Sequence, residues 1–458
     1  MRKNIGFVST RFAGTDGVSL ESNKWAENLE KLGHTVFWFA GEHNKRPEKS
    51  ILVPEAHFQH SANIWINDRI WGAKRRDCEV TRRIHELRLY LKLRLYQFLQ
   101  AFNIDFLIVE NALAIPMNIP LGLALTEVLA ETEIPSIAHH HDFFWERERF
   151  SVNSVNDYLC MAFPPRIPNL KHIVINSVAQ EQLSLRTSIS SQIVPNVLDF
   201  DNPPAADTRK KASFKREIGL GADDIIILQP TRIIQRKGIE HTIDLIHALA
   251  DPKYKLIISH EAGDEGFEYL EWLEEYAVEH DVDLIMVNTC ISDSWNCTAE
   301  LKDRYSLWDL YSYADFITYP SLSEGFGNAL LEAIYFKKPI LVNRYATFIR
   351  DIEPLGFEFV TMDGFLSKKT IQAVKEIMAS SVRKEKMTRN NYEIASRHYS
   401  YSVLQMHLTS ILSNIDRQGQ SSPEIFEKSK QAVRNVRHFY KEQCAGWNRP
   451  AEIMELSG

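Results

Sequence analysis

The stretch SEGFGNALLEA, residues 323–333, places two carboxylates around a glycine turn. Glu324 precedes Gly-Phe-Gly, and Glu332 follows eight positions later, about one turn into an apolar helical pattern. Glycines let a backbone approach a ligand closely, and the free N–H groups of a first helical turn favour anions and hydroxyl oxygens. Carboxylates beside amide donors suit a ligand that is both polyhydroxylated and phosphorylated. The alternative is a capped helix with a solvated glutamate, and this stretch alone leaves both interpretations open.

Basic residues lie in a loop that follows a strand-like segment. DIIILQP, residues 224–230, has the pattern of a buried strand, and Arg232, Arg236 and Lys237 come between it and the next helical pattern. A basic pair at a helix N-terminus is a natural clamp for a diphosphate. A solvated basic loop is the alternative.

The composition is that of an ordinary globular protein. The chain has 458 residues, 44% hydrophobic and 25% charged, which allows two large or three smaller domains. Its net charge of −7 argues against nucleic acid as the main partner. Five scattered cysteines without a CxxC pair indicate a reducing compartment. Since the sequence shows neither a signal peptide nor an apolar run of about 18 residues, we expect a cytoplasmic protein without an integral membrane segment.

Strand and helix patterns alternate along the chain and restart once. Short apolar runs predict strands buried on both faces at 4–9, 35–40, 105–110, 135–139 and 172–176, and then at 224–230, 254–259, 283–288, 315–320, 339–343 and 357–360. Helical patterns lie between them at 18–32, 80–101, 237–250, 267–279, 301–313, 327–337 and 368–380. This alternation predicts an α/β protein with two parallel-sheet domains.

A connector rich in proline, alanine and charge separates the two patterns. We predict an N-terminal domain over 1–200, a linker over 201–214, a second domain over 215–395 and a helical C-terminal segment over 396–458. The last segment contains a long helical pattern at 422–443 that could pack back across the domains. Ligands of such proteins bind beyond the carboxyl ends of the strands, so we expect the site in the cleft between the domains.

Several common motifs are missing from the sequence. Neither half has G-x-G-x-x-G after a strand, since Leu330 stands where GFGNAL would need its third glycine. Walker A, H-E-x-x-H and G-x-S-x-G are also missing. The sequence therefore does not favour a dinucleotide dehydrogenase, an ATPase, a zinc hydrolase or a serine hydrolase.

The motifs of the second half resemble the family 4 retaining glycosyltransferases of GT-B architecture. PTR…RKG (230–238) precedes LYSYADFITYPSLSEGFGNALLEAIYFKKPIL (310–341), in which Glu324 and Glu332 match the family's E-x7-E signature and Pro339 leads the next strand. The resemblance is strongest over 224–345 and looser over 1–200, where VPNVLD (194–199) is similar to the family's Pro-Asn segment. It implies a GT-B fold with two Rossmann-like, doubly wound domains facing a central cleft. A compatible-solute type such as mannosylglucosylglycerate synthase is one candidate subfamily.

The resemblance implies a donor site for a nucleotide diphosphate sugar. Arg232 and Lys237 would hold the diphosphate and neutralise it as it leaves, Glu324 would contact the transferred sugar, and Glu332 would hold the ribose. The segment 286–291 would border the base. The polar stretch after it is longer than the family's connector, which leaves the nucleotide open. The remaining donor-binding residues implied are Gly17, Gly325, Phe326, Gly327 and Asn328.

The resemblance also implies that the first domain supplies the acceptor site. A glycine loop in residues 9–29 matches one that closes over the donor phosphate in the family, and the family's His-Asp pair favours His141 as a catalytic residue. Arginines among aromatics in IAHHHDFFWERERF (137–150) suit a sugar with an acidic group, although a tight turn and an aromatic core patch are the alternatives. The acceptor-binding residues implied are Gly14, Thr15, Asp16, His139, Asp142, Arg147 and Arg149.

Neither a metal site nor a cofactor is expected. Three consecutive strand histidines alternate between faces and cannot easily converge on one ion. The basic amphipathic helix at 80–102 could lie on an anionic membrane, but packing of its leucines on the sheet is favoured.

We therefore expect a metal-independent, retaining hexosyltransferase. Its donor would be a GDP- or UDP-sugar, and its acceptor the hydroxyl of a small, acidic compound such as a glycerate glycoside. The alternatives left open are a nucleotide-sugar epimerase of the same architecture, a transferase for a lipid-linked acceptor at the membrane surface, and a binding module without catalysis.

Overall fold

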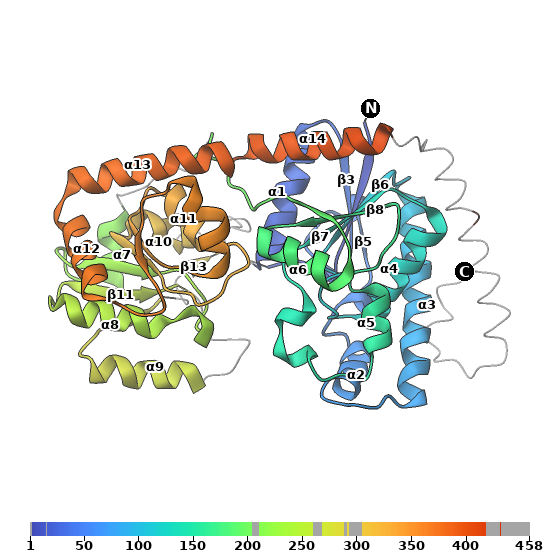
Figure 1. The fold of residues 1–458 in the computed structure, drawn as a ribbon, viewed down its shortest axis with the longest axis horizontal. Helices are drawn as coiled ribbons and strands as arrows, with labels where there is room; N and C mark the ends of the chain where they lie inside the picture. The colour runs from blue at the N-terminus through green and yellow to red at the C-terminus, as the bar shows by residue number, and fades with distance from the viewer. Residues whose placement is uncertain are drawn as a thin grey trace. The chain divides into compact units, whose positions relative to one another are not determined.

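Short apolar, β-branched runs form the strands of two parallel sheets (Figure 1). The computed structural model describes residues 2–14, 16–203, 210–259, 268–287, 291–292, 305–417 and 431. Unit 1 comprises Met1–Ile175, Ala179–Val194 and Gln405–Gly458, and unit 2 comprises Asn176–Val178 and Pro195–Leu404. Thr15, the helix at 422–443 and parts of 201–214 and 286–291 lie outside the described residues. Those predictions and the domain boundaries therefore stay predictions.

The sheet of unit 1 runs in the order β5-β3-β1-β6-β7-β8-β9, and every neighbouring pair is parallel. The strand order reverses between β1 and β6, and ligands of open parallel sheets bind beside such a reversal. The strands are β1 (Asn4–Val8), β3 (Thr35–Ala40), β5 (Ser50–Leu52), β6 (Phe106–Glu110), β7 (Ser136–His140), β8 (Leu170–Val174) and β9 (Ser191–Ile193).

Helices cover both faces of this sheet, with α3 and α4 on one side and α1 on the other (Figure 1). Leu91, Leu95 and Leu99 of α3 are buried in one core cluster with apolar side chains of α4 and β6. The packing of the leucines on the sheet, which the sequence favoured, is therefore found. The helices are α1 (Gly17–Lys31), α2 (Ser61–Ile70), α3 (Cys78–Ala101), α4 (Ile119–Thr132), α5 (Asn156–Ala162) and α6 (Ser177–Thr187).

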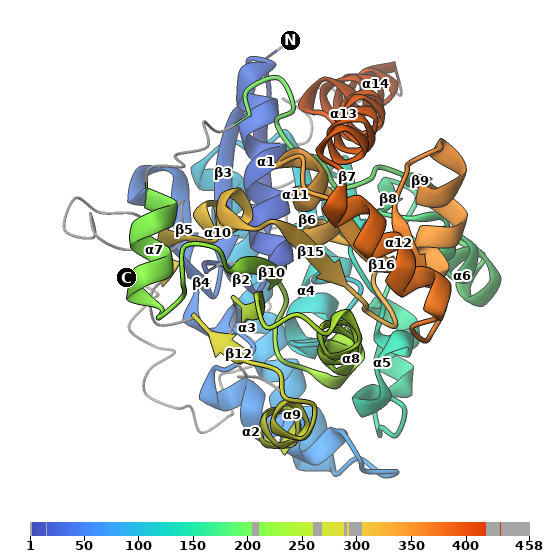
Figure 2. The same ribbon diagram turned by 90° about the vertical axis from the view of Figure 1, so that its left-hand side faces the viewer.

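The sheet of unit 2 runs in the order β12-β11-β10-β15-β16-β17 and is also parallel, with its reversal between β10 and β15. Figure 2 shows α8 and α9 on one side of β10 and β15, and α11 on the other. The strands are β10 (Ile225–Gln229), β11 (Tyr254–Ile258), β12 (Leu284–Met286), β15 (Phe316–Tyr319), β16 (Ile340–Asn343) and β17 (Val360–Met362). The helices are α7 (Lys211–Glu217), α8 (Ile239–Leu249), α9 (Glu268–Glu279), α10 (Leu307–Tyr313), α11 (Asn328–Tyr335), α12 (Lys368–Ala379) and α13 (Ser381–His398).

The C-terminal helix α14 (Tyr401–Arg417) belongs to unit 1 from Gln405 onward. Gln405 Nε2 donates a hydrogen bond to Asn28 Oδ1 of α1 at 2.9 Å. Two short pairs of strands complete the described elements, β2 (Arg11–Phe12) with β4 (Glu42–His43) and β13 (Ile291–Ser292) with β14 (Tyr305–Ser306).

Candidate functional site

The loops after β10 and β15 lie side by side in unit 2, because these strands are neighbours at the reversal of strand order. The backbone N–H of Leu322 donates to the carbonyl of Arg236 at 2.9 Å, which joins the two loops directly. Arg232 and Lys237 stand in the first loop and Glu324 in the second. The parallel sheet therefore brings together residues that are about 90 positions apart in the sequence.

Gln229, the last residue of β10, holds the basic loop in place. Its side chain is fully buried, its Oε1 accepts a hydrogen bond from Thr242 Oγ1 at 2.6 Å, and its Nε2 donates to the carbonyl of Lys237 at 3.2 Å. Gly238 then adopts φ +61°, and a Cβ at this position would lie 2.7 Å from the carbonyl oxygen of Pro320. The loop can begin α8 in this way only with glycine, which fixes where the side chain of Lys237 starts.

Glu324 forms an ion pair with Lys237, and both side chains are about nine-tenths buried. Arg236 Nη1 lies 3.4 Å from the other oxygen of Glu324. Burial alone would raise the pKa of Glu324, but the charges of Lys237 and Arg236 outweigh it and lower the pKa below its usual value. Burial lowers the pKa of Lys237. Glu324 is therefore held ionised, in contact with the cations predicted to bind a diphosphate.

Hydrogen bonds to the carbonyls of Gly325 and Phe326 hold the GFG turn. The turn places the amino end of α11 close to Glu324 in the sequence. Asn176 Nδ2 donates to the carbonyl of Gly325 at 2.5 Å, and Tyr345 Oη donates to that of Phe326 at 2.8 Å. Gly327 has φ +110°, and a Cβ there would collide with the Tyr345 hydroxyl. The turn therefore requires glycine at this position, and it leaves the first amides of α11 at the carboxyl edge of the sheet.

Asn328, the first residue of α11, is held by the segment VPNVLD. Asn196 Nδ2 donates to Asn328 Oδ1 at 2.7 Å, while Asn196 Oδ1 is buried and has no hydrogen-bond partner within the described ranges. A buried acceptor without a partner is costly in a core, so it marks a position that a ligand can satisfy.

Glu332 lies on α11, and Tyr311 of α10 fixes its carboxylate. The Tyr311 hydroxyl is fully buried and donates to Glu332 Oε2 at 2.6 Å. Burial and the charge of Glu332 raise the pKa of this hydroxyl well above its usual value, so it stays a donor. The sequence did not indicate Tyr311 as the partner of Glu332, because its aromatic ring looks like that of any other core residue of an amphipathic helix.

In unit 1, Glu110 at the end of β6 faces two of the three consecutive histidines. His139 Nδ1 lies 2.9 Å and His141 Nε2 3.3 Å from Glu110 Oε2. His140 points to the other face, where its Nε2 lies 3.0 Å from His172 Nδ1. The alternation of strand side chains therefore holds, and it places His139 and His141 together. Glu110 was not among the predicted site residues, because it has the position of an ordinary strand residue.

Glu110, His139 and His141 are of the types that bind metals, and their ligand atoms lie within 4.8 Å of one another. Glu110 Oε2 already accepts a hydrogen bond from each imidazole, which accounts for the closeness of the three groups without an ion. We interpret them as a hydrogen-bonded cluster.

Asp142 and the two arginines after it occupy different environments. Arg147 forms an ion pair with Asp142, whose Oδ1 accepts from Asn111 Nδ2 at 2.8 Å. Arg149 lies over the ring of Phe150, 4.5 Å from its centroid, in an exposed position. The charge of Arg147 is therefore already balanced by Asp142, which weakens the prediction that Arg147 binds an acidic group of the acceptor.

The glycine loop before α1 is a helix cap. Asp16 Oδ1 accepts hydrogen bonds from the backbone N–H groups of Val18 and Ser19, each at 3.1 Å, and Asp16 also pairs with Arg11. Gly14 has φ +79° with open space around its Cα, and Gly17 begins the helix. The cap accounts for Asp16 structurally, and whether the loop also binds an acceptor stays a prediction.

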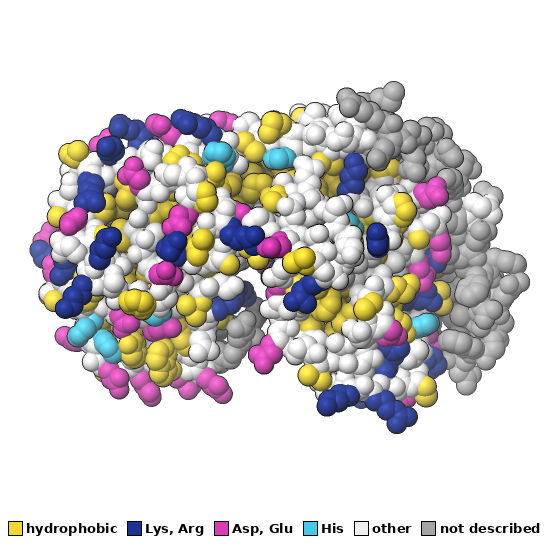
Figure 3. All heavy atoms as spheres, in the orientation of Figure 1, with side chains coloured by type: hydrophobic (Ala, Val, Ile, Leu, Met, Phe, Trp, Pro, Cys, Tyr) yellow, Lys and Arg dark blue, Asp and Glu magenta, His cyan; other side chains and the backbone are white. Residues whose placement is uncertain are grey.

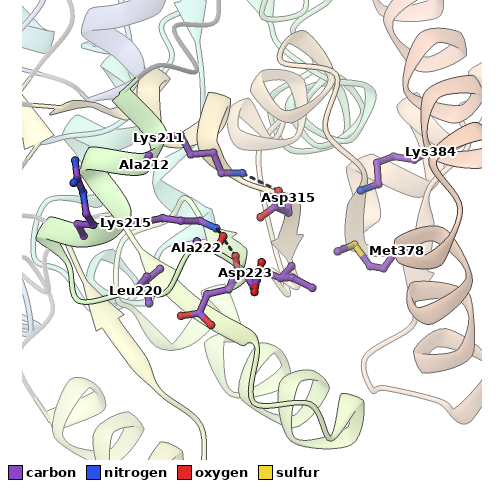
Figure 4. Close-up of a pocket in the computed structure, with 12 residues that line it drawn as sticks. Lys211, Ala212, Lys215, Leu220, Ala222, Asp223, Asp315, Met378 and Lys384 are labelled. Atoms are coloured by element: carbon purple, nitrogen blue, oxygen red, sulfur yellow. Dashed lines mark hydrogen bonds and ion pairs between the residues drawn. The ribbon is translucent and has the colours of Figure 1, made fainter.

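A pocket of about 850 Å³ lies at the opposite edge of the unit 2 sheet, beside the amino ends of β10 and β15 (Figure 4). Lys211 forms an ion pair with Asp315 at 2.9 Å, and Lys215 donates to the carbonyls of Ala222 and Asp224. These lysines satisfy groups of the protein itself, and the pocket is at the wrong strand ends for the predicted donor site.

The basic residues of α3 also have partners within unit 1. Arg82 pairs with Glu79 and Glu86, Arg88 with Glu127, and Lys92 with Glu127 and Glu131. These cations are balanced by the protein's own carboxylates, which does not favour an anionic membrane as their partner. Within the described ranges, every helix is too short or too polar to cross a membrane.

Two parallel-sheet units, each with one reversal of strand order, and charged residues at the reversal of the second agree with the GT-B fold that the sequence predicts. The family described as "Glycosyl transferases group 1" matches residues 210–398. Mannosylglucosylglycerate synthase of Petrotoga mobilis is 34% identical over 380 residues, which cover 78% of this chain and 86% of that protein. The Thermotoga maritima enzyme of the same name is 31% identical over 437 residues, covering 88% and 97%. The chain belongs to the group 1 glycosyltransferases.

A solved structure shows the same fold at low sequence similarity. A glycosyltransferase from Rickettsia africae superposes with a TM-score of 0.66 at 14% identity, over 92% of this chain and 100% of that one. The predicted GT-B fold and the resemblance to mannosylglucosylglycerate synthases are confirmed. The roles of individual site residues stay predictions.

Proposed function

We propose that this protein transfers a mannosyl group from a nucleotide diphosphate sugar to a hydroxyl of a small glycerate glycoside. The observation that carries the proposal is the similarity to two proteins named mannosylglucosylglycerate synthase, which extends over most of this chain. A GDP-linked donor is our first choice, and a UDP-linked donor is the second.

The donor half of the site supports this chemistry in unit 2. Lys237, Arg236 and Arg232 supply positive charge for a diphosphate, and the first amides of α11 supply donors for its oxygens. Glu324 accepts hydrogen bonds from the sugar hydroxyls. Glu332, oriented by Tyr311, accepts from the ribose.

The reaction breaks the bond between the anomeric carbon and the diphosphate oxygen and forms a bond to the acceptor oxygen. The cations stabilise the negative charge that develops on the leaving diphosphate, so we propose that no metal ion is needed. The acceptor enters on the face from which the diphosphate leaves, which retains the anomeric configuration. The acceptor proton passes to an oxygen of the leaving phosphate, so an enzyme nucleophile is not required.

The experiment is a matrix of donors and acceptors with the purified chain. GDP-mannose, UDP-glucose and ADP-glucose are each combined with glucosylglycerate, glycerate, a neutral glycerol glycoside, a polyprenyl phosphate or no acceptor, with and without a chelator. We expect a glycoside from GDP-mannose and glucosylglycerate, retention by NMR, and unchanged rates with the chelator.

Other outcomes of this matrix would contradict the proposal. Isomerised donor formed without any acceptor would indicate an epimerase. Product from polyprenyl phosphate but not from the glycerate compounds would indicate a lipid-linked acceptor. Nucleotide binding without turnover of any pair would indicate a binding module.

A further inference from the structure

Glu110, His139 and His141 form a buried polar cluster at the strand reversal of unit 1. Glu110 and His139 are direct neighbours in the register of β6 and β7, and His141 follows two residues later on the same face. Glu110 and His139 have 0% of their side chains exposed, and His141 has 10%. His141 is therefore the member of the cluster that a ligand can reach.

The cluster contains more unsatisfied polar atoms than a structural core tolerates. Trp25 of α1 stacks on His139 with ring centroids 4.2 Å apart, and Glu21 of α1 is also fully buried. Glu110 Oε1, His139 Nε2, Glu21 Oε1 and Trp25 Nε1 are buried without a hydrogen-bond partner in the part of the chain that the structure describes. Each such atom costs roughly 1–3 kcal/mol of stability, so a purely structural role does not explain the cluster.

The hydrogen bonds determine which nitrogen of His141 a ligand can meet. An ionised carboxylate only accepts, so His141 Nε2 carries the hydrogen that points to Glu110 Oε2. Among the described residues, no hydrogen bond uses His141 Nδ1. This nitrogen donates when the ring is protonated and accepts when it is neutral, so the charge of His141 decides which ligand atom it can bind.

The charges around His141 favour the protonated ring. Burial alone would lower the pKa of His141, but the hydrogen bond and charge of Glu110, with the charges of Glu21 and Asp142, outweigh it and raise the pKa above its usual value. Burial alone would raise the pKa of Glu110, but the two histidines hold it at about 2. The cations nearby, Lys24 and Arg147, are paired with Glu21 and Asp142. His139 also faces His141, with ring centroids 4.5 Å apart.

We propose that Glu110 is a positioning residue, which orients His141 and keeps it protonated so that Nδ1–H donates a hydrogen bond to an oxygen of the sugar substrate. The inference rests on the proposed function, because it assigns the charge state of a histidine in that reaction. A protonated imidazole can bind a hydroxyl oxygen or a developing negative charge, whereas a neutral one in this tautomer can only accept.

The test compares Glu110→Gln and Glu110→Asp with Glu79→Gln, which removes an exposed carboxylate of α3 in the same unit. Rates are measured from pH 5.5 to 9, and folding is checked by thermal melting. In the parent enzyme, kcat should fall as His141 loses its proton on the alkaline side. Glu110→Gln should move this limb to lower pH and lose about 100-fold in kcat at pH 8, with KM for the donor little changed. Glu110→Asp should recover part of the loss, and Glu79→Gln should match the parent.

A second measurement does not depend on turnover. NMR titration of the imidazole nitrogens, with His141→Gln for assignment, should give a lower pKa for His141 in Glu110→Gln than in the parent. An unchanged His141 pKa, or an equal loss of kcat at every pH, would overturn the positioning role. Stoichiometric metal that is lost in Glu110→Gln would also overturn it, because the three residues would then be ligands. If no donor sugar is turned over, the proposed function fails while the titration still decides the pairing of Glu110 with His141.

Discussion

At the scale of single residues, the buried ion pair between Glu324 and Lys237 lies at the centre of the proposed donor site. Both charges are about nine-tenths buried, so removing one partner leaves the other desolvated without compensation. The pair also sets the chemistry of the site, because an ionised Glu324 can only accept hydrogen bonds. Substitutions at this pair must therefore be assayed for folding as well as for rate.

We expect Glu324→Gln to lower kcat by about 100-fold or more, because the neutral amide cannot provide the same charge to the transferred sugar. The variant keeps the size of the side chain, and circular dichroism with thermal melting checks that it folds. Glu376→Gln, on the exposed surface of α12, is the matched control and should retain parent activity. A Glu324→Gln enzyme with parent kcat would show that this carboxylate does not take part in transfer.

Tyr311→Phe should weaken donor binding by about 10-fold, because it removes a hydrogen bond to the ionised carboxylate of Glu332. The measurement is Kd for the nucleoside diphosphate by calorimetry. Tyr276→Phe is the control. The hydroxyl of Tyr276, on α9, also donates to a carboxylate of unit 2, Asp244 Oδ1 of α8 at 2.7 Å, but this pair is not part of the proposed site. If both variants bind equally well, the orientation of Glu332 has no part in nucleotide binding.

The sequence indicated the charged residues of the donor site but not the groups that hold them. Glu324 and Lys237 could be placed in one site from sequence, since each follows a strand and parallel strands end at one edge, but their ion pair was not predicted. Gln229, Tyr311 and Glu110 were not indicated. Each is a buried residue in a strand or a helix, and only the three-dimensional neighbours give its polar atoms a role.

At the scale of elements, the period of apolar residues located the central strands but not the edges of the sheets. The runs predicted at 105–110 and 224–230 correspond to β6 and β10, which are shorter by one residue at the start of the first run and by one at each end of the second. The edge strands β5 and β9, SIL and SQI, are short and partly polar, so they were missed. The helix α4 was also missed, because IPLGLALTEVLAET is buried nearly all round and shows no amphipathic period.

The predicted strand at 357–360 lies too early, since β17 is Val360–Met362. Phe357 and Phe359 stack on each other, with ring centroids 5.3 Å apart, before the strand begins. The predicted helix at 301–313 also starts too early, because Tyr305 and Ser306 form β14. A capping box of Ser306 with Asp309 begins α10 at Leu307.

Gly327→Ala should destabilise unit 2 and abolish activity. The cost has two parts, the left-handed φ of +110°, roughly 1–2 kcal/mol, and the collision of the new Cβ with the Tyr345 hydroxyl. Urea unfolding of the double variant Gly327→Ala/Tyr345→Phe separates them, because losing the hydroxyl removes the collision, and the single variant Tyr345→Phe measures the cost of losing its hydrogen bond to the carbonyl of Phe326. If the double variant is no more stable than expected from adding the single variants, the collision contributes nothing.

The pair of His140 and His172 in the sheet of unit 1 should make the protein sensitive to acid. Burial lowers the pKa of His172 to about 4 and that of His140 well below its usual value. In the unfolded chain these histidines take up protons near pH 6.5, whereas in the folded protein they do so only at lower pH. The free energy of unfolding is therefore highest above pH 6.5 and decreases as the pH falls from about 6.5 toward 4. His172 alone accounts for about 3 kcal/mol over this window.

Urea unfolding between pH 7.5 and 4 measures this loss. His172→Gln should be less stable than the parent at pH 7.5 but should lose less stability on acidification. His398→Gln, in an exposed position, should follow the parent curve. A His172→Gln curve parallel to that of the parent would mean that this histidine does not carry the acid sensitivity.

At the scale of the whole molecule, the distribution of charge bears on the kind of ligand that the protein binds. On the face drawn in Figure 3, the basic side chains of unit 2 are interleaved with acidic ones. At the carboxyl ends of β10 and β15, Lys237 and Arg236 converge on Glu324. This distribution suits a small anionic ligand, held at one edge of a sheet, better than an extended polyanion, which needs a continuous basic surface.

The assignment of the proposed donor site to unit 2 predicts which backbone amides a bound nucleotide protects from hydrogen exchange. GDP or UDP should protect the backbone amides of residues 231–238 and 325–331 from hydrogen exchange, because these segments supply the cations and the helix amides of the donor site. At 100-fold excess over Kd the nucleotide stabilises the state that binds it by about 2.7 kcal/mol, which slows exchange through unfolding of unit 2. Lys237→Ala should reduce this protection, and Arg383→Ala, on the surface of α13, should not. Protection confined to unit 1 would contradict the assignment of the donor site to unit 2.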